Sequence, residues 1–269
     1  MRTIVHLSDL HFGRSDPELV APLTASIRDL NPDLIAVSGD LTQRARSREF
    51  QEARAFLDQF AQPKIVVPGN HDVPLYNVYN RFLRPLDKFR RYVTPDLQPT
   101  FANDEMIVIG VSTARSLVVK GGRINRLQLA WVTERFCALP DDVVKILVTH
   151  HPFDLPSGYD DRDLVGRAKM AMAGLAECGA DVFLAGHLHV SHTGSTAQRY
   201  QIQGHSALVV QAGTAISTRG RGEANSFNVV RIEHPNISVE RFMYQPPTQF
   251  FTPAHVEKFT WSSEGWVRT

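Results

Sequence analysis

The sequence predicts an α/β fold in which helices cover two β-sheets that pack face to face. Three observations lead to this prediction. Short apolar runs alternate with amphipathic segments through the first two thirds of the 269 residues, and the last third contains mostly extended runs separated by Gly, Pro and Asn. The composition, 43% hydrophobic and 21% charged, is that of an ordinary globular protein. Alternating strands and helices followed by further strands are typical of a layered α/β sandwich with a β-rich C-terminal part.

Short runs of aliphatic residues mark the strands of the first two thirds. Each run is too short for a helix and contains β-branched residues, which favours a buried strand. The predicted strands are residues 4–7, 34–37, 65–67, 106–111, 146–148 and 182–184.

Capping residues and apolar periodicity mark the helices between these strands. Asp16 is the expected N-cap of a helix over 17–30, with Pro17 at its first position. A helix over 47–60 places its apolar residues on one face. Further helices are predicted over 76–92 with a break near Pro85, from a cap at Asn125 to about residue 139, and over roughly 163–178.

The C-terminal third lacks helical periodicity. Extended runs are predicted at residues 200–202, 207–211, 227–232 and 237–242. Residues 244–269 contain Pro246, Pro247 and Pro253 and are expected to wrap the surface as a tail. We found no repeat or linker, so residues 1–269 are predicted to form a single domain.

Charge and cysteine content restrict the classes of partner and compartment. A net charge of +1 is low for a protein that binds long nucleic acids through its charge. Cys137 and Cys178 are the only cysteines, and they are expected to be reduced, buried residues. We see neither a signal-peptide pattern at the N-terminus nor an apolar run of about 18 residues. The expectation is therefore a cytoplasmic protein without a membrane partner.

Five polar motifs each follow one of the predicted strands. They are Asp9-Leu10-His11, Gly39-Asp40, Gly69-Asn70-His71-Asp72, His150-His151-Pro152 and Gly186-His187-Leu188-His189. The carboxyl ends of parallel strands meet at one edge of a sheet, where ligands bind. Imidazole and carboxylate ligands together suit Zn, Fe and Mn. The glycines at 39, 69 and 186 are expected to let the backbone turn sharply as it leaves each strand.

In this order, the motifs resemble those of the calcineurin-like metallophosphoesterase superfamily, whose fold is a four-layer αββα sandwich. Within it, the closest resemblance is to the class III cyclic-nucleotide phosphodiesterase branch. The segments that carry this resemblance are Leu7-Ser8-Asp9-Leu10-His11-Phe12-Gly13, Ser38-Gly39-Asp40-Leu41-Thr42, Pro68-Gly69-Asn70-His71-Asp72 and Gly186-His187-Leu188-His189.

The resemblance implies a site for two divalent metal ions, Mn, Fe or Zn. It assigns Asp9, His11 and His189 to the first ion, assigns Asn70, His150 and His187 to the second, and makes Asp40 the bridge. A water activated between two such ions would attack the phosphate ester.

Two further residues beside the ligands receive roles. His71 is the expected general acid, because it directly follows a ligand and an imidazole titrates near neutral pH. Asp72 and His151 are expected to support the loops rather than to bind metal.

The predicted activity is metal-dependent hydrolysis of a phosphodiester, with a cyclic nucleotide or a related small diester as substrate. Phosphomonoesters and nucleotide-sugar lipid pyrophosphates on the same site are alternatives, as is a non-catalytic metal-binding scaffold. A homodimer is compatible with the resemblance. The sequence leaves open the native substrate, the metal, and whether Arg44, Arg219 or Arg221 contacts substrate.

Overall fold

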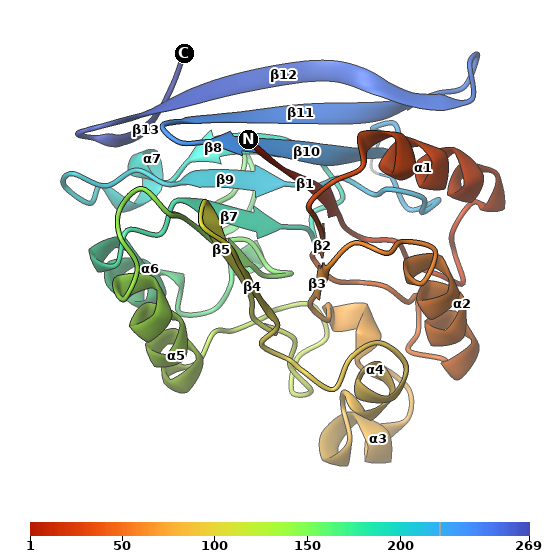
Figure 1. Cartoon of the computed structure of the whole chain (residues 1–269). Helices are drawn as coiled ribbons and strands as arrows, with labels where there is room; N and C mark the ends of the chain where they lie inside the picture. Colours follow the sequence, from red (N-terminus) through yellow and green to blue (C-terminus); the bar gives the residue numbers. More distant parts are fainter. Residues whose placement is uncertain (221) are drawn as a thin grey trace.

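Two β-sheets form the centre of the molecule in a computed structural model that describes residues 1–220 and 222–269 (Figure 1). The seven-stranded sheet has the order β13-β12-β11-β10-β1-β2-β3, and the six-stranded sheet has the order β4-β5-β6-β7-β9-β8. β1 to β3 run parallel to one another, as do β5, β6, β7 and β9. The strands are β1 (Arg2–Leu7), β2 (Leu34–Val37), β3 (Lys64–Val66), β4 (Thr100–Ala102), β5 (Met106–Gly110), β6 (Val144–Val148), β7 (Val182–Ala185), β8 (His192–Ser195), β9 (Leu208–Gln211), β10 (Ser226–Glu233), β11 (Asn236–Gln245), β12 (Phe250–Ser262) and β13 (Gly265–Arg268).

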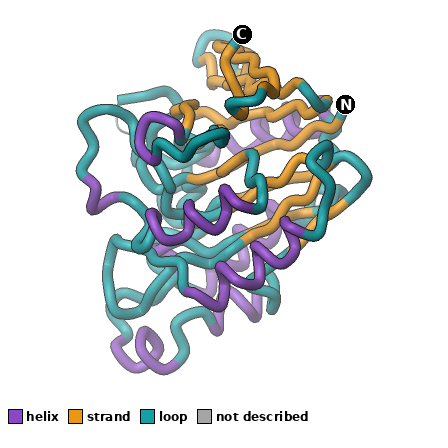
Figure 2. The backbone as a smooth tube through the Cα atoms, turned by 90° about the vertical axis from the view of Figure 1, so that its left-hand side faces the viewer, coloured by secondary structure: helices purple, strands orange, loops and turns teal. Residues whose placement is uncertain are grey.

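Helices flank both sheets (Figure 2). They are α1 (Pro17–Leu30), α2 (Ser47–Leu57), α3 (Val78–Leu83), α4 (Asp87–Tyr92), α5 (Arg126–Cys137), α6 (Ala168–Glu177) and α7 (Ala197–Tyr200), with 3-10 turns at Asn70–Asp72 and Asp161–Asp163. As predicted, Asp16 caps α1 and accepts from the backbone N–H of Glu18, and Asn125 caps α5. Among the described residues, no helix has both the length and the apolar character needed to cross a bilayer.

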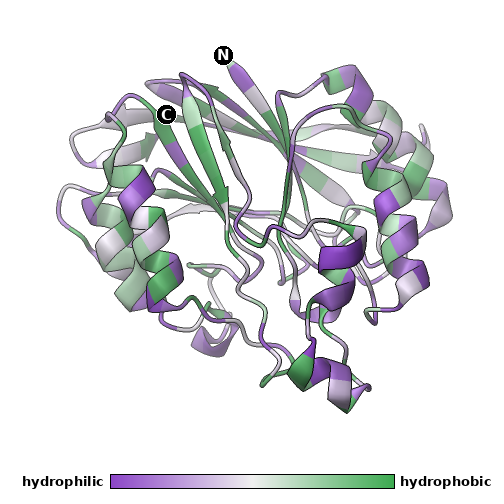
Figure 3. Ribbon diagram, turned by 60° about the horizontal axis from the view of Figure 1, so that its bottom comes forward, coloured by the Kyte–Doolittle hydropathy of each residue, from purple (hydrophilic) through white to green (hydrophobic). Residues whose placement is uncertain are grey.

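The fold has four layers, two of helices and two of β-sheet, and three apolar clusters lie between them. The middle cluster joins the two sheets through inward side chains such as Ile4, Ala36 and Val108. One outer cluster packs α1, α2 and α4 against the seven-stranded sheet, and the other packs α5 and α6 against the six-stranded sheet. Alternate residues along β1 face opposite sides, since Ile4 enters the middle cluster and Val5 an outer one. The predicted αββα sandwich is confirmed, and Figure 3 shows the apolar strands between the helical layers.

Two predicted elements differ from the structure. Residues 200–202 are not extended: Tyr200 ends α7, and Gln201 has a left-handed backbone. The helix expected from residue 163 begins only at Ala168, because Gly166 pairs with Arg123 in an isolated β-bridge. Both segments contact distant parts of the chain, since the hydroxyl of Tyr200 donates to the carbonyl oxygen of Phe153 and Gly166 bridges to Arg123. A local pattern does not reveal such contacts.

The C-terminal segment is regular rather than a tail over the surface. β12 pairs with β11 along its length and β13 pairs with β12, which extends the seven-stranded sheet. Phe251, Phe259 and Trp266 bury their rings in the apolar clusters, and this burial fixes the segment in the sheet.

The expectation of two reduced cysteines is wrong in this structure. Cys137, the last residue of α5, forms a disulfide with Cys178, which directly follows α6. The two residues are 41 positions apart in sequence and meet because α5 and α6 pack side by side on the same sheet. This proximity is a property of the tertiary fold.

Candidate metal centre

The five motifs converge at the carboxyl ends of β1, β2, β3, β6 and β7, where the two sheets meet. Asp9 and His11 follow β1, Asp40 follows β2, and Asn70 and His71 follow β3. The remaining ligand candidates come from the other sheet: His150 follows β6, and His187 and His189 follow β7. Most of these side chains are buried, and Asn70, His71 and His187 are partly exposed.

The first ligand group contains Asp9, His11 and His189. Oδ1 of Asp9 lies 3.6 Å from Nε2 of His11 and 3.4 Å from Nε2 of His189. The two imidazoles stack with ring centroids 5.0 Å apart. Together with Asp40, this group offers four ligand atoms that all lie within 4.8 Å of one another.

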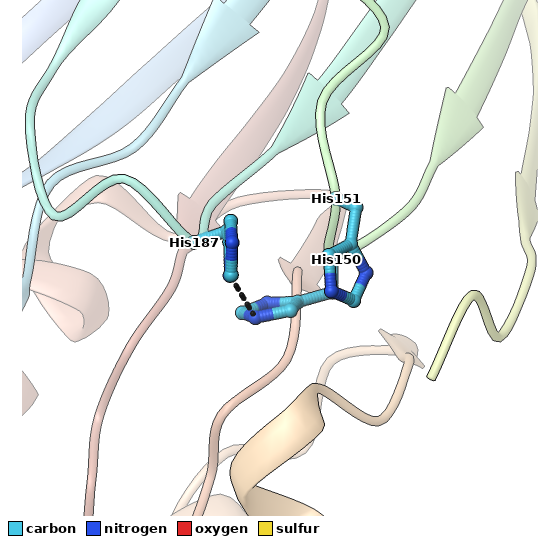
Figure 4. Close-up of side chains that lie close together, drawn as sticks. All are labelled: His150, His151 and His187. Atoms are coloured by element: carbon cyan, nitrogen blue, oxygen red, sulfur yellow. Dashed lines mark hydrogen bonds between the residues drawn. The ribbon is translucent and has the colours of Figure 1, made fainter. Parts of the chain in front are cut away.

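The second ligand group contains Asn70, His150 and His187. Figure 4 shows His150 and His187 with the neighbouring His151. Oδ1 of Asn70 lies 3.1 Å from both Nε2 of His150 and Nδ1 of His187, and these two nitrogens are 3.3 Å apart. Ligand atoms about 2.1 Å from a shared cation are roughly 3.0–3.4 Å apart in octahedral or tetrahedral geometry. The triangle therefore has the dimensions of a metal site.

Asp40 lies between the two groups. Its Oδ2 is 3.7 Å from Nε2 of His11 and 3.4 Å from Nε2 of His150, while its Oδ1 accepts from the backbone N–H of His71 at 2.8 Å. Burial would raise the pKa of this carboxyl, but His150 and His11 hold the pKa well below its usual value. A permanently charged carboxylate in this position can bridge two cations.

The protonation states of the imidazoles also suit metal binding. Burial lowers the pKa of His187 to about 3 and that of His189 to about 4, so both rings are neutral, the form that binds metal. For His150, burial acts in the same direction, but Asp40 outweighs it and raises the pKa to about 9. His150 would therefore release a proton to a metal ion that it binds.

Hydrogen bonds from outside the two groups orient the ligands. Nδ1 of His150 donates to the carbonyl oxygen of Ser38 at 2.8 Å, which leaves Nε2 directed at Asn70 and Asp40. Oδ2 of Asp9 accepts from Oγ of Ser8 and from the backbone N–H of His187. Oδ1 of Asp9 is buried and has no hydrogen-bond partner among the described residues. An unsatisfied buried carboxylate oxygen is costly, and a cation at this position would compensate it.

Left-handed backbone conformations are concentrated at this centre. Five of the seven ligand candidates have a φ between 46° and 74°; they are Asp9, His11, Asp40, His187 and His189. Such a residue costs roughly 1–3 kcal/mol when it is not glycine, and it persists only where the surroundings fix it. Backbone hydrogen bonds from Asp9 to Gly39 and from His11 to Asp40 help to do so. Clustered strain of this kind is typical of functional sites.

The motif glycines have two different roles. Gly39 has a φ of 93° and allows the sharp turn that the sequence predicted. Gly69 and Gly186 are required for close approach instead. A Cβ atom at Gly69 would lie 2.1 Å from Oδ1 of Asp40, and one at Gly186 would lie 1.8 Å from Oγ of Ser8.

His71 lies beside the ligand groups without joining them. Its Nδ1 donates to the carbonyl oxygen of Gln43 at 2.9 Å, and its Nε2 accepts from Nη1 of Arg219 at 2.9 Å. The ring is 4.9 Å from that of His11, centroid to centroid. Burial lowers the pKa of His71, although Asp40 opposes the shift.

Asp72 and His151 support the loops, as their sequence context suggested. The Asp72 carboxylate accepts from the backbone N–H groups of Leu41, Thr42 and Gly69 and so ties the second motif to the third. Both ring nitrogens of His151 are engaged, with Oγ1 of Thr113 and with the carbonyl oxygen of Lys120, each at 2.8 Å. His151 therefore has no free nitrogen for a metal, although it lies beside His150 and His187.

Arg219 is the main addition that the structure makes to the site. Its Nη1 also lies 3.5 Å from Nε2 of His11, so the guanidinium faces both a ligand candidate and the expected acid. Its distance from the other motifs in sequence left its role open. Arg44 lies over the ring of Tyr76 at 5.6 Å, and Arg221 is outside the described residues.

The sequence of the chain is similar to those of known proteins. The sequence model of the calcineurin-like phosphoesterase family matches residues 2–191. A glycerophosphodiester phosphodiesterase from Enterobacter lignolyticus is 32% identical over 94 residues, 31% of this chain and 33% of that protein. A probable cyclic nucleotide phosphodiesterase from Synechococcus is 23% identical over 65% of this chain and 64% of its own length. The chain thus spans less than two thirds of either relative.

The fold also matches solved structures. A dimetal phosphatase from Danio rerio superposes with a TM-score of 0.71 at 13% sequence identity, covering 97% of this chain and 99% of that protein. At this identity the likeness concerns the fold. It shows that the two proteins share the two-sheet sandwich.

Proposed function

The chain belongs to the calcineurin-like phosphoesterase family, and from that premise we propose that it hydrolyses a phosphodiester, with a cyclic nucleotide or a related small diester as substrate. One observation carries the proposal: two compact ligand groups share a single charged carboxylate, Asp40. This is the arrangement that two-metal hydrolases use on phosphate esters.

The residues present fit two divalent cations of the Mn, Fe or Zn type. Asp9, His11 and His189 would hold one, Asn70, His150 and His187 the other, and Asp40 both. Bound there, the cations would supply an activated water and neutralise charge on the phosphate. Asn70 is a neutral oxygen ligand, which keeps negative charge low beside an anionic substrate.

His71 and Arg219 provide the remaining chemistry from the protein itself. The hydrogen bond from Nδ1 of His71 to Gln43 leaves Nε2 as the atom that carries the transferable proton. A substrate phosphate would take over the hydrogen bond that Arg219 now gives to Nε2. The same negative charge raises the pKa of His71 again, so that the protonated ring can deliver its proton to the leaving oxygen.

The substrate class rests on the relatives. Their names describe cyclic-nucleotide and glycerophosphodiester phosphodiesterases, which both cleave diesters. A phosphomonoesterase or a nucleotide-sugar lipid pyrophosphatase remains the alternative on the same residues. A scaffold without activity is disfavoured, because all seven ligand candidates and His71 are present.

A hydrolysis panel on metal-loaded protein tests the proposal. It compares bis-nitrophenyl phosphate, nitrophenyl phosphate, 2′,3′- and 3′,5′-cyclic AMP, and a glycerophosphodiester. We expect diesters to be cleaved faster than the monoester and a cyclic nucleotide to be among the substrates. Preference for the monoester would overturn the diesterase assignment, and silence on every ester with both metals bound would overturn the enzyme assignment.

A further inference from the structure

An exposed apolar surface lies next to the metal centre. Seven large apolar side chains on α3, on the residue pair before it and on the loop 115–120 are exposed to solvent. We call them the apolar lip: Tyr76, Val78, Tyr79, Phe82, Leu83, Leu117 and Val119. They are more than half of the twelve exposed large apolar side chains among the described residues. A concentration of this kind marks an interaction site rather than ordinary surface.

Hydrogen bonds connect the apolar lip to the residues of the metal centre. Arg81 is buried on the inner side of α3, where Nη1 donates to the carbonyl oxygen of Pro74 and Nη2 donates to that of Val118. This side chain holds the two parts of the lip together. The loop 115–120 is held in turn by the hydrogen bond between His151 and the carbonyl oxygen of Lys120. The lip therefore has a fixed position relative to His150 and His187.

A basic groove adjoins the lip. A hollow of about 580 Å³ between α3 and α4 is lined by Arg84, Lys88, Arg90 and Arg91, and Asp87 is its one acidic lining residue. Residues 73–94 hold five basic residues and one acidic residue, a net charge of +4, whereas the whole chain carries +1. The other residues of the chain therefore carry a net charge of −3. Apolar exposure and positive charge therefore coincide around α3 and α4. These two helices project from the rest of the molecule (Figures 1 and 3).

We propose that the apolar lip and the basic groove dock the protein on a membrane surface that carries anionic phospholipids. Exposed aromatic and aliphatic side chains beside Lys and Arg are the features with which helices lie in the headgroup region of a bilayer. Tyr76 and Tyr79 suit that region, because a tyrosine has an apolar ring and a polar tip. The groove cations would face anionic headgroups.

Docking departs from the expectation that no membrane partner exists. That expectation rested on the lack of a spanning apolar run, whereas the lip combines short segments from residues 76–83 and 117–119. Peripheral docking requires an apolar face, not a span. It also goes beyond the proposed function, because it concerns where the metal centre works and not which ester bond it cleaves.

A second copy of the chain is the competing occupant of the lip. A twofold interface places the same surface of both copies together. The basic groove of one copy would then face that of the other, and like charges across an interface are unfavourable. Charge complementarity therefore favours an anionic lipid surface over a homodimer through this face.

Vesicle co-sedimentation of the full chain tests the inference without any activity readout. Vesicles of phosphatidylcholine alone are compared with vesicles that also contain phosphatidylglycerol in a 7:3 ratio. We expect binding to the mixed vesicles and little binding to phosphatidylcholine alone. The paired substitution Phe82→Ser/Leu83→Ser should abolish binding. The pair Arg90→Gln/Arg91→Gln should weaken it by about fivefold per arginine.

Matched controls use exposed apolar residues on other faces, Leu127→Ser/Val256→Ser, which should bind as the unaltered protein does. Absence of binding to the mixed vesicles, or equal loss in the control pair, would overturn the inference. So would a dimer in analytical ultracentrifugation that Phe82→Ser/Leu83→Ser dissociates. If that pair fails to fold, the exposed arginine pair decides the question alone. Failure of the hydrolysis panel would leave the vesicle result unaffected.

Discussion

The two ligand groups are similarly compact, but they differ in the features that would attract a cation. The first group presents the carboxylate of Asp9, whose Oδ1 is buried and accepts no hydrogen bond from the part of the chain that the structure describes. The second group has no carboxylate of its own apart from the shared Asp40, and its three ligand atoms already form a triangle with sides of 3.1–3.3 Å. The first group therefore attracts a cation by charge, and the second by geometry. We expect the first metal to be held more tightly than the second.

The substitution Asp40→Asn should affect both ligand groups at once. It removes the charge that both groups share, so both metals should be lost or displaced. Activity on bis-nitrophenyl phosphate should fall by more than the roughly 10²–10⁴-fold attributed to a single acid–base group. Metal content after dialysis, measured by mass spectrometry, checks the cause. Two retained metals with normal turnover would show that Asp40 is no bridge.

A matched pair, Asp9→Asn and Asn70→Ala, separates the two groups. Asn70→Ala should release one metal and weaken its binding by more than the 10–100-fold that follows from losing a ligand's supporting partner. Asp9→Asn should weaken binding of the other metal. This loss of affinity should be the larger of the two, because the substitution removes a charge. Metal titration by calorimetry on both variants provides the measurement. Equal effects on both metals from either variant would contradict two separable groups.

The substitution His71→Gln should leave both ligand groups intact, so it tests the acid separately from metal binding. Both metals should remain, and turnover should fall by roughly 10²–10⁴-fold, because the proton donor is lost. The pH profile provides a second readout, since its dependence on this imidazole should disappear. Loss of a metal in this variant would make His71 a ligand instead of an acid.

The smallest expected effect is that of metal removal on the stability of the fold. A ligand that binds only the folded state at a hundred times its dissociation constant adds about 2.7 kcal/mol per site. For a chain of this size, each occupied site therefore raises the melting temperature by roughly 5–10 °C relative to the chelated protein. Asn70→Ala should lose only part of this difference in a thermal melt. A melting temperature indifferent to chelator would argue against metal binding in the folded state.

Local patterns were sufficient to predict the strands that carry the site motifs and the residues gathered at their ends, although the short strand β4 was not predicted. The cap at Asp16 and the strand before Asp40 are encoded within a few neighbouring residues. Features that depend on distant segments were not predictable. Arg219 reaches His71 across 148 positions, and Cys137 meets Cys178 only because two helices pack together.

The strained backbone at the five left-handed ligand positions has a consequence for the life of the protein in the cell. Their combined cost is comparable with the net stability of a typical domain, roughly 5–15 kcal/mol. Bound metal would offset part of this cost, and a chain without metal would then unfold more often. Unfolded chains are removed by proteases, so abundance follows the folded fraction. Cellular metal supply would then set how many copies survive, in addition to how many are active.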